Sequence, residues 1–355
     1  MNKAISLIKQ PELRLALTAG LSAGLVITLG LPDAIYAPLA VAAALGGTLG
    51  SSWTLGVQRL EGTLLGGLIV VIAHGGIGSA MPMPIGIALA LACTRLFGGS
   101  LGLRSGYKVA GLVVVMGWTV HSGALASWVP LRMLVTLIGI LLSLLAINCF
   151  WPSRALTEHK RLSVLLFEQF ATALQERAEH LARGVDMDAE TKMQRRDGLI
   201  QNLLALQNQR PDANVELGTD HAGEYLLRLW DLEEQFFSEL LGYYRTLLRL
   251  PMVPMQGPSF SAVLAAEVNL LHESAQLLRQ WAQQWPEGRP NNSAARSNGQ
   301  QWPWEAALVQ AEQELFNDPA SSEIMLQKGR GRREMLCQQL AAALGRFEQS
   351  WASLG

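Results

Sequence analysis

The chain has 355 residues, of which half are hydrophobic and only 16% are charged, against about a quarter in a typical soluble domain. A net charge of −1, with no basic runs interleaved with aromatic residues, argues against a nucleic-acid-binding protein. Cys93, Cys149 and Cys337 follow neither a disulfide nor a metal-binding spacing, so no metal centre and no disulfide framework are expected.

Charge divides the chain in two. Residues 1–153 hold 8 basic and 3 acidic residues, a net charge of +5, whereas residues 154–355 hold 20 basic and 26 acidic residues, a net charge of −6. This change of composition is expected where a chain passes from a bilayer into water. The sequence therefore predicts an all-α protein with a transmembrane domain at 1–153 and a cytoplasmic helical domain at 154–355.

Six apolar stretches in the first domain approach the length of about 20 residues that a helix needs to cross a bilayer. They are Leu13–Leu31, Ile35–Trp53, Leu60–Ile77, Pro84–Phe97, Tyr107–His121 and Val129–Phe150. The fourth and fifth are short, so a tilted or re-entrant course is the alternative for these two. The stretches predict a six-helix transmembrane bundle.

The distribution of basic residues predicts the orientation of this bundle, because cytoplasmic loops carry an excess of lysine and arginine. Arg132 is the one basic residue near the connections on one side. The other side holds Lys3, Lys9, Arg14, Arg59, Arg95, Arg104, Lys108, Arg154, Lys160 and Arg161. The alternation predicts six spans with both ends cytoplasmic, in a multi-pass protein of the bacterial inner (plasma) membrane. An organellar membrane is the alternative.

Small residues recur at a spacing that suits close helix contacts. Three Gly-x-x-x-Gly pairs lie in the apolar stretches, namely Gly20 and Gly24, Gly46 and Gly50, and Gly62 and Gly66. Glycine lets two helix backbones approach closely, so that van der Waals packing holds them together within the bilayer. We expect these pairs to pack helices, with a compact bundle around a transport pathway as the functional interpretation.

Ionisable residues in or near membrane spans are costly and tend to be functional. Here basic side chains outnumber acidic ones, which favours an anion over a cation as the substrate. The candidate anion-binding residues are Arg59, Arg95, Arg104, Lys108 and Arg132, and the candidate proton carriers are Asp33, Glu61, His74 and His121. Topology anchoring at helix ends is the alternative role for each of them.

The second domain has the composition of a soluble helical protein. Apolar residues at helical spacing predict helices at 155–183, 188–209, 219–250, 259–285, 302–316 and 323–352. Its tryptophan and phenylalanine stripes are expected to form a core. Residues 286–301 are rich in Pro, Asn, Ser and Gly, which predicts a flexible loop.

Motifs of catalysis are missing from the sequence. There is no Gly-x-x-x-x-Gly-Lys-Ser/Thr phosphate loop, no His-Glu-x-x-His and no Cys-x-x-Cys. We therefore expect neither an enzyme nor a cofactor, and no catalytic residues are assigned.

The segment Gln58-Arg59-Leu60-Glu61-Gly62-Thr63-Leu64-Leu65-Gly66-Gly67 carries the pattern Arg-x-x-Gly-Thr-x-x-Gly. At the expected start of the third helix, this pattern resembles the fusaric acid resistance and aromatic acid exporter superfamily. The segment Phe150-Trp151-Pro152, where the chain leaves the last apolar stretch, is similar to the corresponding segment of the same family. The resemblance implies six spans followed by a helical cytoplasmic region, as in the related plant aluminium-activated malate transporters, which are dimeric anion channels.

The resemblance implies export of small organic acids, often aromatic carboxylates. Family exporters often carry two such modules, so this single module is expected to form a homodimer. Arg59 would sit at a cytoplasmic mouth, and Thr63 would bond back to a helix carbonyl or offer its hydroxyl to a carboxylate. A passive anion channel and a membrane-anchored scaffold without transport are the alternatives.

Overall fold

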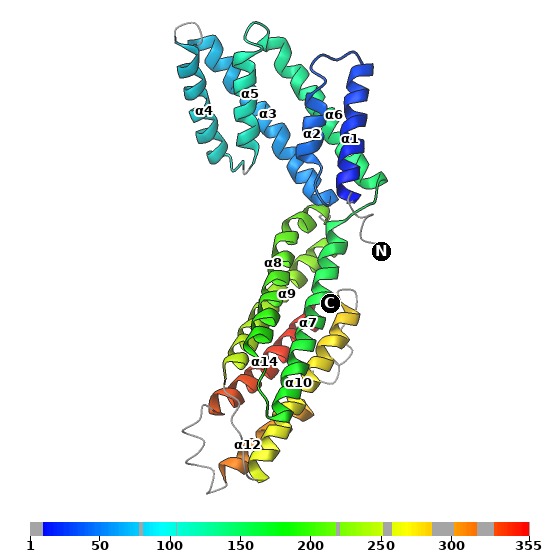
Figure 1. The fold of residues 1–355 in the computed structure, drawn as a ribbon, viewed down its shortest axis with the longest axis vertical. Coiled ribbons are helices and arrows are strands. Elements are labelled where there is room, and N and C mark those ends of the chain that lie inside the picture. The colour runs from blue at the N-terminus through cyan, green and yellow to red at the C-terminus, as the bar shows by residue number, and fades with distance from the viewer. Residues whose placement is uncertain are drawn as a thin grey trace. The chain divides into compact units, whose positions relative to one another are not determined.

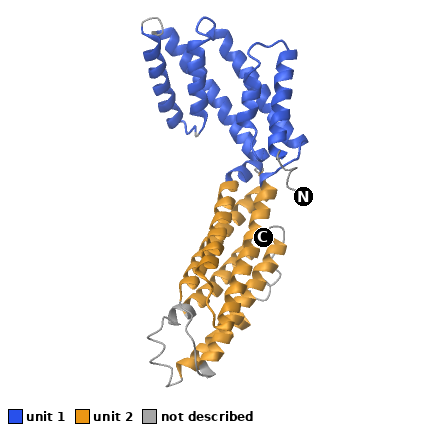
Figure 2. Ribbon diagram, viewed as in Figure 1, with its two compact units in different colours: residues 1–155, 211–216 blue, residues 156–210, 217–355 orange. Residues whose placement is uncertain are grey.

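The computed structural model describes residues 10–77, 81–103, 105–217, 221–250, 258–285, 302–317 and 330–354. These residues form helices and no strand, so the all-α prediction is confirmed for the part of the chain described. The chain divides into two compact units, coloured separately in Figure 2. Unit 1 comprises residues 1–155 and 211–216, and unit 2 comprises residues 156–210 and 217–355.

Unit 1 contains six helices from the N-terminal half of the chain (Figure 1). They are α1 (Gln10–Thr28), α2 (Tyr36–Ala44), α3 (Leu49–Ile77), α4 (Met83–Ser100), α5 (Gly106–Thr119) and α6 (Leu125–Cys149). Among the described residues, three segments are long and apolar enough to cross a membrane: Leu49–Gly76, Met83–Ser100 and Leu125–Cys149. The count of six spans remains a prediction.

The predicted second and third spans are wrong in their boundaries. The stretch Ile35–Trp53 is not one helix, because α2 ends at Ala44 and α3 already begins at Leu49. The break has a local cause in a reciprocal cap. The Ser51 N–H donates to Thr48 Oγ1 at 3.2 Å, and the Thr48 N–H donates to Ser51 Oγ at 3.0 Å. Such a capping box starts a new helix even within an apolar stretch.

Glycines set the closest helix contacts of unit 1. A Cβ on Gly62 would lie 2.2 Å from the carbonyl oxygen of Gly106, and one on Gly66 would lie 2.4 Å from that of Ala110. Because these numbers rise together, α3 and α5 run parallel at backbone contact. This packing depends on the absence of side chains at these two positions of α3.

The other two glycine pairs differ from this one, although Gly50 by itself allows close contact of α3 with the Asp212 backbone of α8. Gly46 lies in the turn before α3 and Gly50 in the first turn of that helix, so the pair does not share a helix face. A Cβ on Gly20 or Gly24 would meet nothing within 4 Å. The buried face of α1 instead carries Arg14, Thr18, Ser22 and Val26, which leaves the two glycines on the opposite side.

Arg14 holds together one end of the helix bundle. Its guanidinium donates to the carbonyl oxygens of Gly46 at 3.1 Å, Gly47 at 3.5 Å and Trp151 at 3.3 Å. The start of α1, the turn between α2 and α3, and the residues after α6 therefore meet at this end. The turns that follow α1 and α5 meet at the other end, where Asp33 approaches His121.

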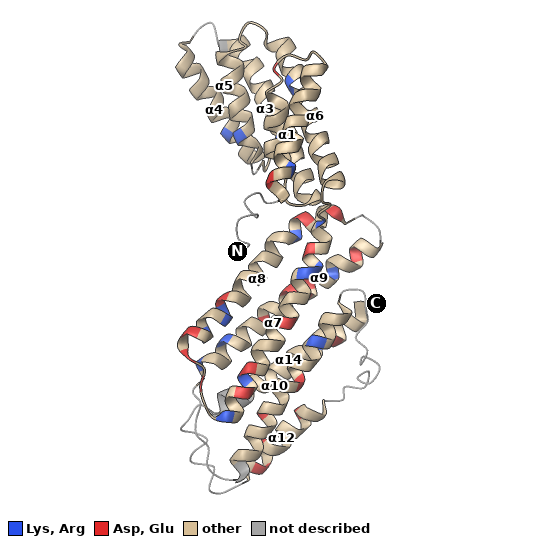
Figure 3. Ribbon diagram, turned by 45° about the vertical axis from the view of Figure 1, so that its right-hand side comes forward, with Lys and Arg blue, Asp and Glu red and all other residues tan. Residues whose placement is uncertain are grey.

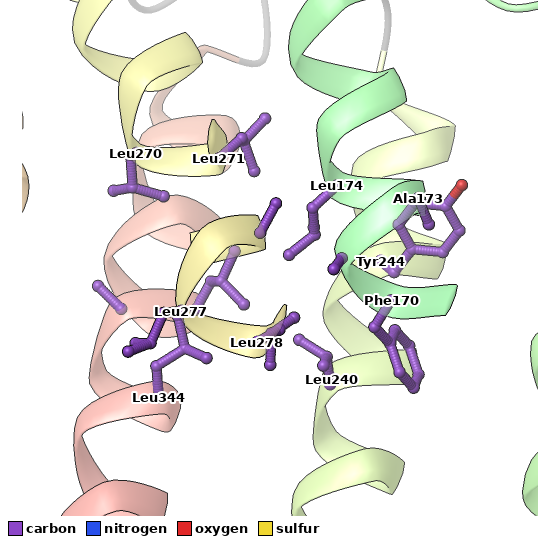
Figure 4. Packing of buried hydrophobic residues seen from close by; sticks show 14 of the residues in the cluster. Phe170, Ala173, Leu174, Leu240, Tyr244, Leu270, Leu271, Leu277, Leu278 and Leu344 are labelled. Carbon is purple, nitrogen blue, oxygen red and sulfur yellow. The ribbon is translucent and has the colours of Figure 1, made fainter. Parts of the chain in front are cut away.

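Unit 2 is built from α7 (Ala155–Arg183), α8 (Ala189–Glu216), α9 (His221–Arg249), α10 (Pro258–Gln284), α12 (Pro303–Phe316) and α14 (Arg330–Leu354). The first residue of α7 and residues 211–216 of α8 belong to unit 1. One large apolar cluster fills it, as the aromatic and leucine stripes predict. In Figure 4, leucines of α10 face Leu174 of α7, Leu240 of α9 and Leu344 of α14.

The charge split seen in the sequence is visible in the structure. Figure 3 shows Lys, Arg, Asp and Glu spread along the helices of unit 2 and sparse on those of unit 1. The surface of unit 1 exposes many large apolar side chains, including Leu21, Leu68, Ile72, Leu96 and Leu141. Such a surface suits the hydrocarbon interior of a bilayer.

The predicted loop at 286–301 lies outside the described residues.

Candidate functional site

Two buried arginines lie on facing helices of unit 1. Arg59 on α3 is 7% exposed, and Arg132 on α6 is 2% exposed. Removing a charged group from water costs several kcal/mol unless an opposite charge or hydrogen bonds replace the lost hydration. The surroundings of each guanidinium therefore decide whether it is structural or poised to bind a ligand.

The packing of α3 against α6 places both arginines in one stretch of the interface between the two helices. A Cβ on Gly56 would lie 2.7 Å from Ile140 Cγ2, and one on Gly67 would lie 2.6 Å from Val129 Cγ1. As the numbers rise on α3 they fall on α6, so the two helices are antiparallel. Arg59 and Arg132 both fall between these two contacts.

Neither guanidinium has a carboxylate paired with it. Within the described part of the chain, no ion pair involves Arg59 or Arg132. Arg59 Nε, Arg132 Nε and Arg132 Nη1 are buried without a hydrogen-bond partner. The two groups are close enough to repel each other electrostatically. Two unneutralised cations with free donors make a site suited to an anion.

Aromatic rings surround Arg132. Its Cζ lies 3.4 Å from the ring centroid of Tyr36 and 5.7 Å from that of Trp128. The two rings meet edge to face at 6.3 Å, and both residues are buried. Cation–π contacts stabilise the guanidinium without neutralising it. Sequence reasoning missed both rings, although the spacing of Trp128 four residues before Arg132 on one helix was a usable signal.

Asp33 and His121 meet beside this cluster. His121 Nε2 lies 3.8 Å from Asp33 Oδ2, and its ring stacks on Trp128 with centroids 4.5 Å apart at an interplanar angle of 14°. Asp33 also attracts Arg132 electrostatically. The structure thus brings two of the four candidate proton carriers to the buried arginines.

The other two candidate proton carriers lie elsewhere in unit 1. Glu61 is exposed on α3, and half-buried His74, near the end of the same helix, meets Trp118 edge to face at 5.5 Å.

The remaining candidate anion ligands are not gathered at this site. Arg95 on α4 is exposed and covers the Tyr107 ring at 4.4 Å, and Lys108 on α5 is also exposed. Arg104 lies outside the described residues. Thr63 is buried and donates its hydroxyl to the Arg59 carbonyl at 2.8 Å, which is the first of the two roles expected for it. Its hydroxyl proton is therefore engaged within α3.

The sequence predicted that Arg59 lies at the start of the third helix, but the structure places it further along α3. It follows Leu49, the first residue of α3, by ten residues. At about 1.5 Å per residue, this places it about 15 Å along the helix axis. Arg59 is therefore an interior residue of α3, and its place at a cytoplasmic mouth stays a prediction.

These features define the class of the protein. Long apolar helices, an apolar outer surface and glycine-mediated helix contacts make it a membrane protein. Residues 19–146 match the protein family described as fusaric acid resistance protein-like, a range that contains both buried arginines and their aromatic neighbours. The resemblance to the fusaric acid resistance superfamily is thereby confirmed for this region. The family points to membrane transport or resistance. No curated protein matches the chain.

Proposed function

We propose that this protein exports small organic anions, aromatic carboxylates among them, and that Arg59 and Arg132 bind the substrate carboxylate. The observation that carries the proposal is the pair of buried guanidiniums without a paired carboxylate. A carboxylate between them would remove their mutual repulsion and accept hydrogen bonds from their free N–H groups. Arg14, by contrast, donates to three backbone carbonyl oxygens, as expected of a structural arginine.

The aromatic neighbours favour a substrate with a ring. Tyr36 and Trp128 are buried next to Arg132 and offer ring faces and edges beside the proposed carboxylate position. Aromatic pairs contribute about 0.5–1.5 kcal/mol beyond the burial of their area. An aromatic acid would therefore bind more tightly than an aliphatic acid of similar charge.

We further propose that the bundle end clamped by Arg14 faces the cytoplasm of a bacterium. The connections at this end are the basic ones in the sequence, and the orientation follows from the excess of positive charge on cytoplasmic loops. The chain continues from α6 into unit 2, which would then be cytoplasmic. The protein would then be a multi-pass protein of the inner membrane.

A homodimer is the proposed assembly. A Cβ on Gly20 or Gly24 would meet nothing within 4 Å, so these glycines leave a smooth face on α1 for a second copy of the chain. Mass measurement by light scattering in detergent tests this, with twice the chain mass of 38.6 kDa as the expected protein component.

Flux from proteoliposomes tests the function. Labelled 4-hydroxybenzoate should leave vesicles that contain the full chain, and Arg59→Gln and Arg132→Gln should each reduce the apparent affinity about tenfold to a hundredfold. This range corresponds to about 1.5–3 kcal/mol for a hydrogen bond to a charged group. The matched control is Arg95→Gln, an exposed arginine on α4, which should transport as the wild type does.

The same vesicles distinguish the alternatives. Flux that survives both arginine substitutions in folded protein would contradict the site. Bilayer currents far above the turnover of a carrier would assign the protein as an anion channel. A folded, correctly oriented protein that moves neither 4-hydroxybenzoate nor malate would contradict transport of these acids.

A further inference from the structure

The pair of Asp33 and His121 lies at the end of the bundle away from Arg14. Asp33 is in the turn between α1 and α2, and His121 is in the turn between α5 and α6. Their side chains are 33% and 19% exposed, so water and protons reach both groups. Asp33 holds a φ of 59°, a left-handed conformation that aspartate tolerates better than most residues.

Asp33 interacts with two cationic groups. It approaches the His121 imidazole at 3.8 Å, and its charge also attracts the Arg132 guanidinium. Trp128 connects the three physically, because its ring stacks on His121 and lies 5.7 Å from Arg132 Cζ. A change of charge at His121 therefore changes how much of the Asp33 charge is felt at Arg132.

Few other ionisable side chains of the described residues lie near the Asp33–His121 pair. In the described apolar cluster, α1 contributes Val26, and Leu31 and Met116 pack against it. The ionisable side chains here are Tyr36 from α2 and Arg132 from α6, with Arg59 of α3 next to Arg132. Among the titratable groups named, imidazole is the one that changes charge between pH 5 and 8 in its ordinary state.

We propose that the Asp33–His121 pair is a proton-binding site linked to the anion site at Arg132. With His121 neutral, the Asp33 carboxylate offsets part of the Arg132 charge and weakens anion binding. A proton on His121 pairs with Asp33, and Arg132 then presents more of its positive charge to the substrate. By reciprocity, a bound anion strengthens proton binding at the pair. Anion binding is therefore accompanied by proton uptake at the pair.

This inference rests on the proposed function, since it needs an anion at Arg132. Its test is titration calorimetry of the full chain in detergent with 4-hydroxybenzoate between pH 6 and pH 8. In this interval the carboxylate of the ligand stays ionised. The wild type should bind about fivefold or more tightly at pH 6 than at pH 8, a coupling of ordinary size for linked sites. Repetition in buffers of different ionisation enthalpy should report proton uptake on binding.

Substitutions separate the pair from the anion site. His121→Gln should still bind the anion, with no pH dependence and no proton uptake. Asp33→Asn should bind tightly at both pH values, because nothing then offsets Arg132. His74→Gln is the matched control, since this half-buried histidine meets Trp118 and not Trp128, and it should keep the wild-type pH dependence.

Each outcome has one meaning. Anion binding to the wild type without proton uptake, or with a pH dependence that His121→Gln retains, overturns the proton site and leaves the anion site standing. Binding of 4-hydroxybenzoate that Arg132→Gln does not weaken overturns the anion site and this inference with it. Uptake of protons that is lost in His121→Gln but kept in His74→Gln establishes the linkage.

Discussion

At the scale of single residues, the three buried arginines among the described residues of unit 1 differ in what surrounds them. Arg14 donates to three backbone carbonyl oxygens, whereas Arg59 Nε, Arg132 Nε and Arg132 Nη1 are buried without a hydrogen-bond partner and neither of these two arginines forms an ion pair in the described structure. The sequence predicted Arg59 and Arg132 as candidates for an anion site. It did not predict that they meet, because the register of α3 against α6 depends on contacts of Gly56 and Gly67 with residues about 60 to 85 positions away.

The clamp role of Arg14 gives a prediction about stability. Arg14→Met keeps the apolar stem and removes the donors to Gly46, Gly47 and Trp151, which leaves those carbonyls without this partner. We expect a loss of about 1–3 kcal/mol in the free energy of unfolding. Thermal unfolding in detergent measures it, and the folded fraction should keep the wild-type affinity for 4-hydroxybenzoate. A variant as stable as the wild type would argue against the clamp.

A buried carboxylate in unit 2 gives a prediction about pH. Burial raises the pKa of Glu233, although the His159 imidazole 3.3 Å away favours the ionised form. In the unfolded chain this carboxyl releases its proton near its ordinary pKa of about 4.3, whereas the folded protein holds the proton to higher pH. The folded state then binds more protons than the unfolded state in this window, so stability should fall as pH rises through it.

Glu233→Gln removes this titration and should flatten the decline in melting temperature as pH rises above about 4.3. The matched control is Glu224→Gln on the same helix, where the carboxylate is exposed and pairs with Arg228. The control should keep the wild-type profile. Parallel profiles for the wild type and Glu233→Gln would contradict a raised pKa for this group.

At the scale of helices, hydropathy predicted where apolar segments lie better than where helices begin. It found the region of every helix in unit 1, since apolar length alone marks a candidate span. It joined α2 to the first residues of α3, because a hydropathy window averages over the turn at residues 45–48. The capping pair of Thr48 and Ser51 was present in the sequence as the local signal that hydropathy ignores.

The contact of α3 with α5 gives a prediction at this scale. Gly62→Ala places a Cβ 2.2 Å from the Gly106 carbonyl oxygen, so the two backbones must move apart. We expect a loss of about 1–3 kcal/mol, the usual range for overpacking. Gly75→Ala on the same helix is the matched control, because its Cβ would meet nothing within 4 Å. Melting temperatures in detergent compare the two, and equal values would contradict close packing at Gly62.

At the scale of the whole molecule, the chain combines two units whose surfaces suit different solvents, a lipid bilayer for unit 1 and water for unit 2. Unit 1 is stabilised by glycine contacts and exposes apolar side chains, whereas unit 2 encloses an aromatic core and exposes charges. Composition alone located the change near residue 153, close to the point where the contacts divide at residue 155. Which aromatic side chains meet inside unit 2 was not predictable, because they come from helices far apart in the sequence.

The core of unit 2 gives a prediction for the molecule as a whole. Phe347 on α14 lies among five rings: Phe236 at 4.2 Å, Trp281 at 5.1 Å, Trp285 at 5.8 Å, and Phe167 and Trp351 at 6.0 Å. Phe347→Ala should destabilise unit 2 by about 3–5 kcal/mol. Hydrogen exchange of the full chain should detect the loss of protection in α7, α9, α10 and α14. Unchanged exchange there would contradict a single shared core.

The most direct measurement of the central claim is a double-mutant cycle on the affinity for 4-hydroxybenzoate. It compares the wild type, Arg59→Gln, Arg132→Gln and the double variant, each as the full chain in detergent. If both guanidiniums hold one carboxylate, each single change weakens binding strongly and the double change weakens it by clearly less than the sum, since groups that share a ligand are coupled. Strictly additive effects, or wild-type affinity in either single variant, would contradict a shared anion site.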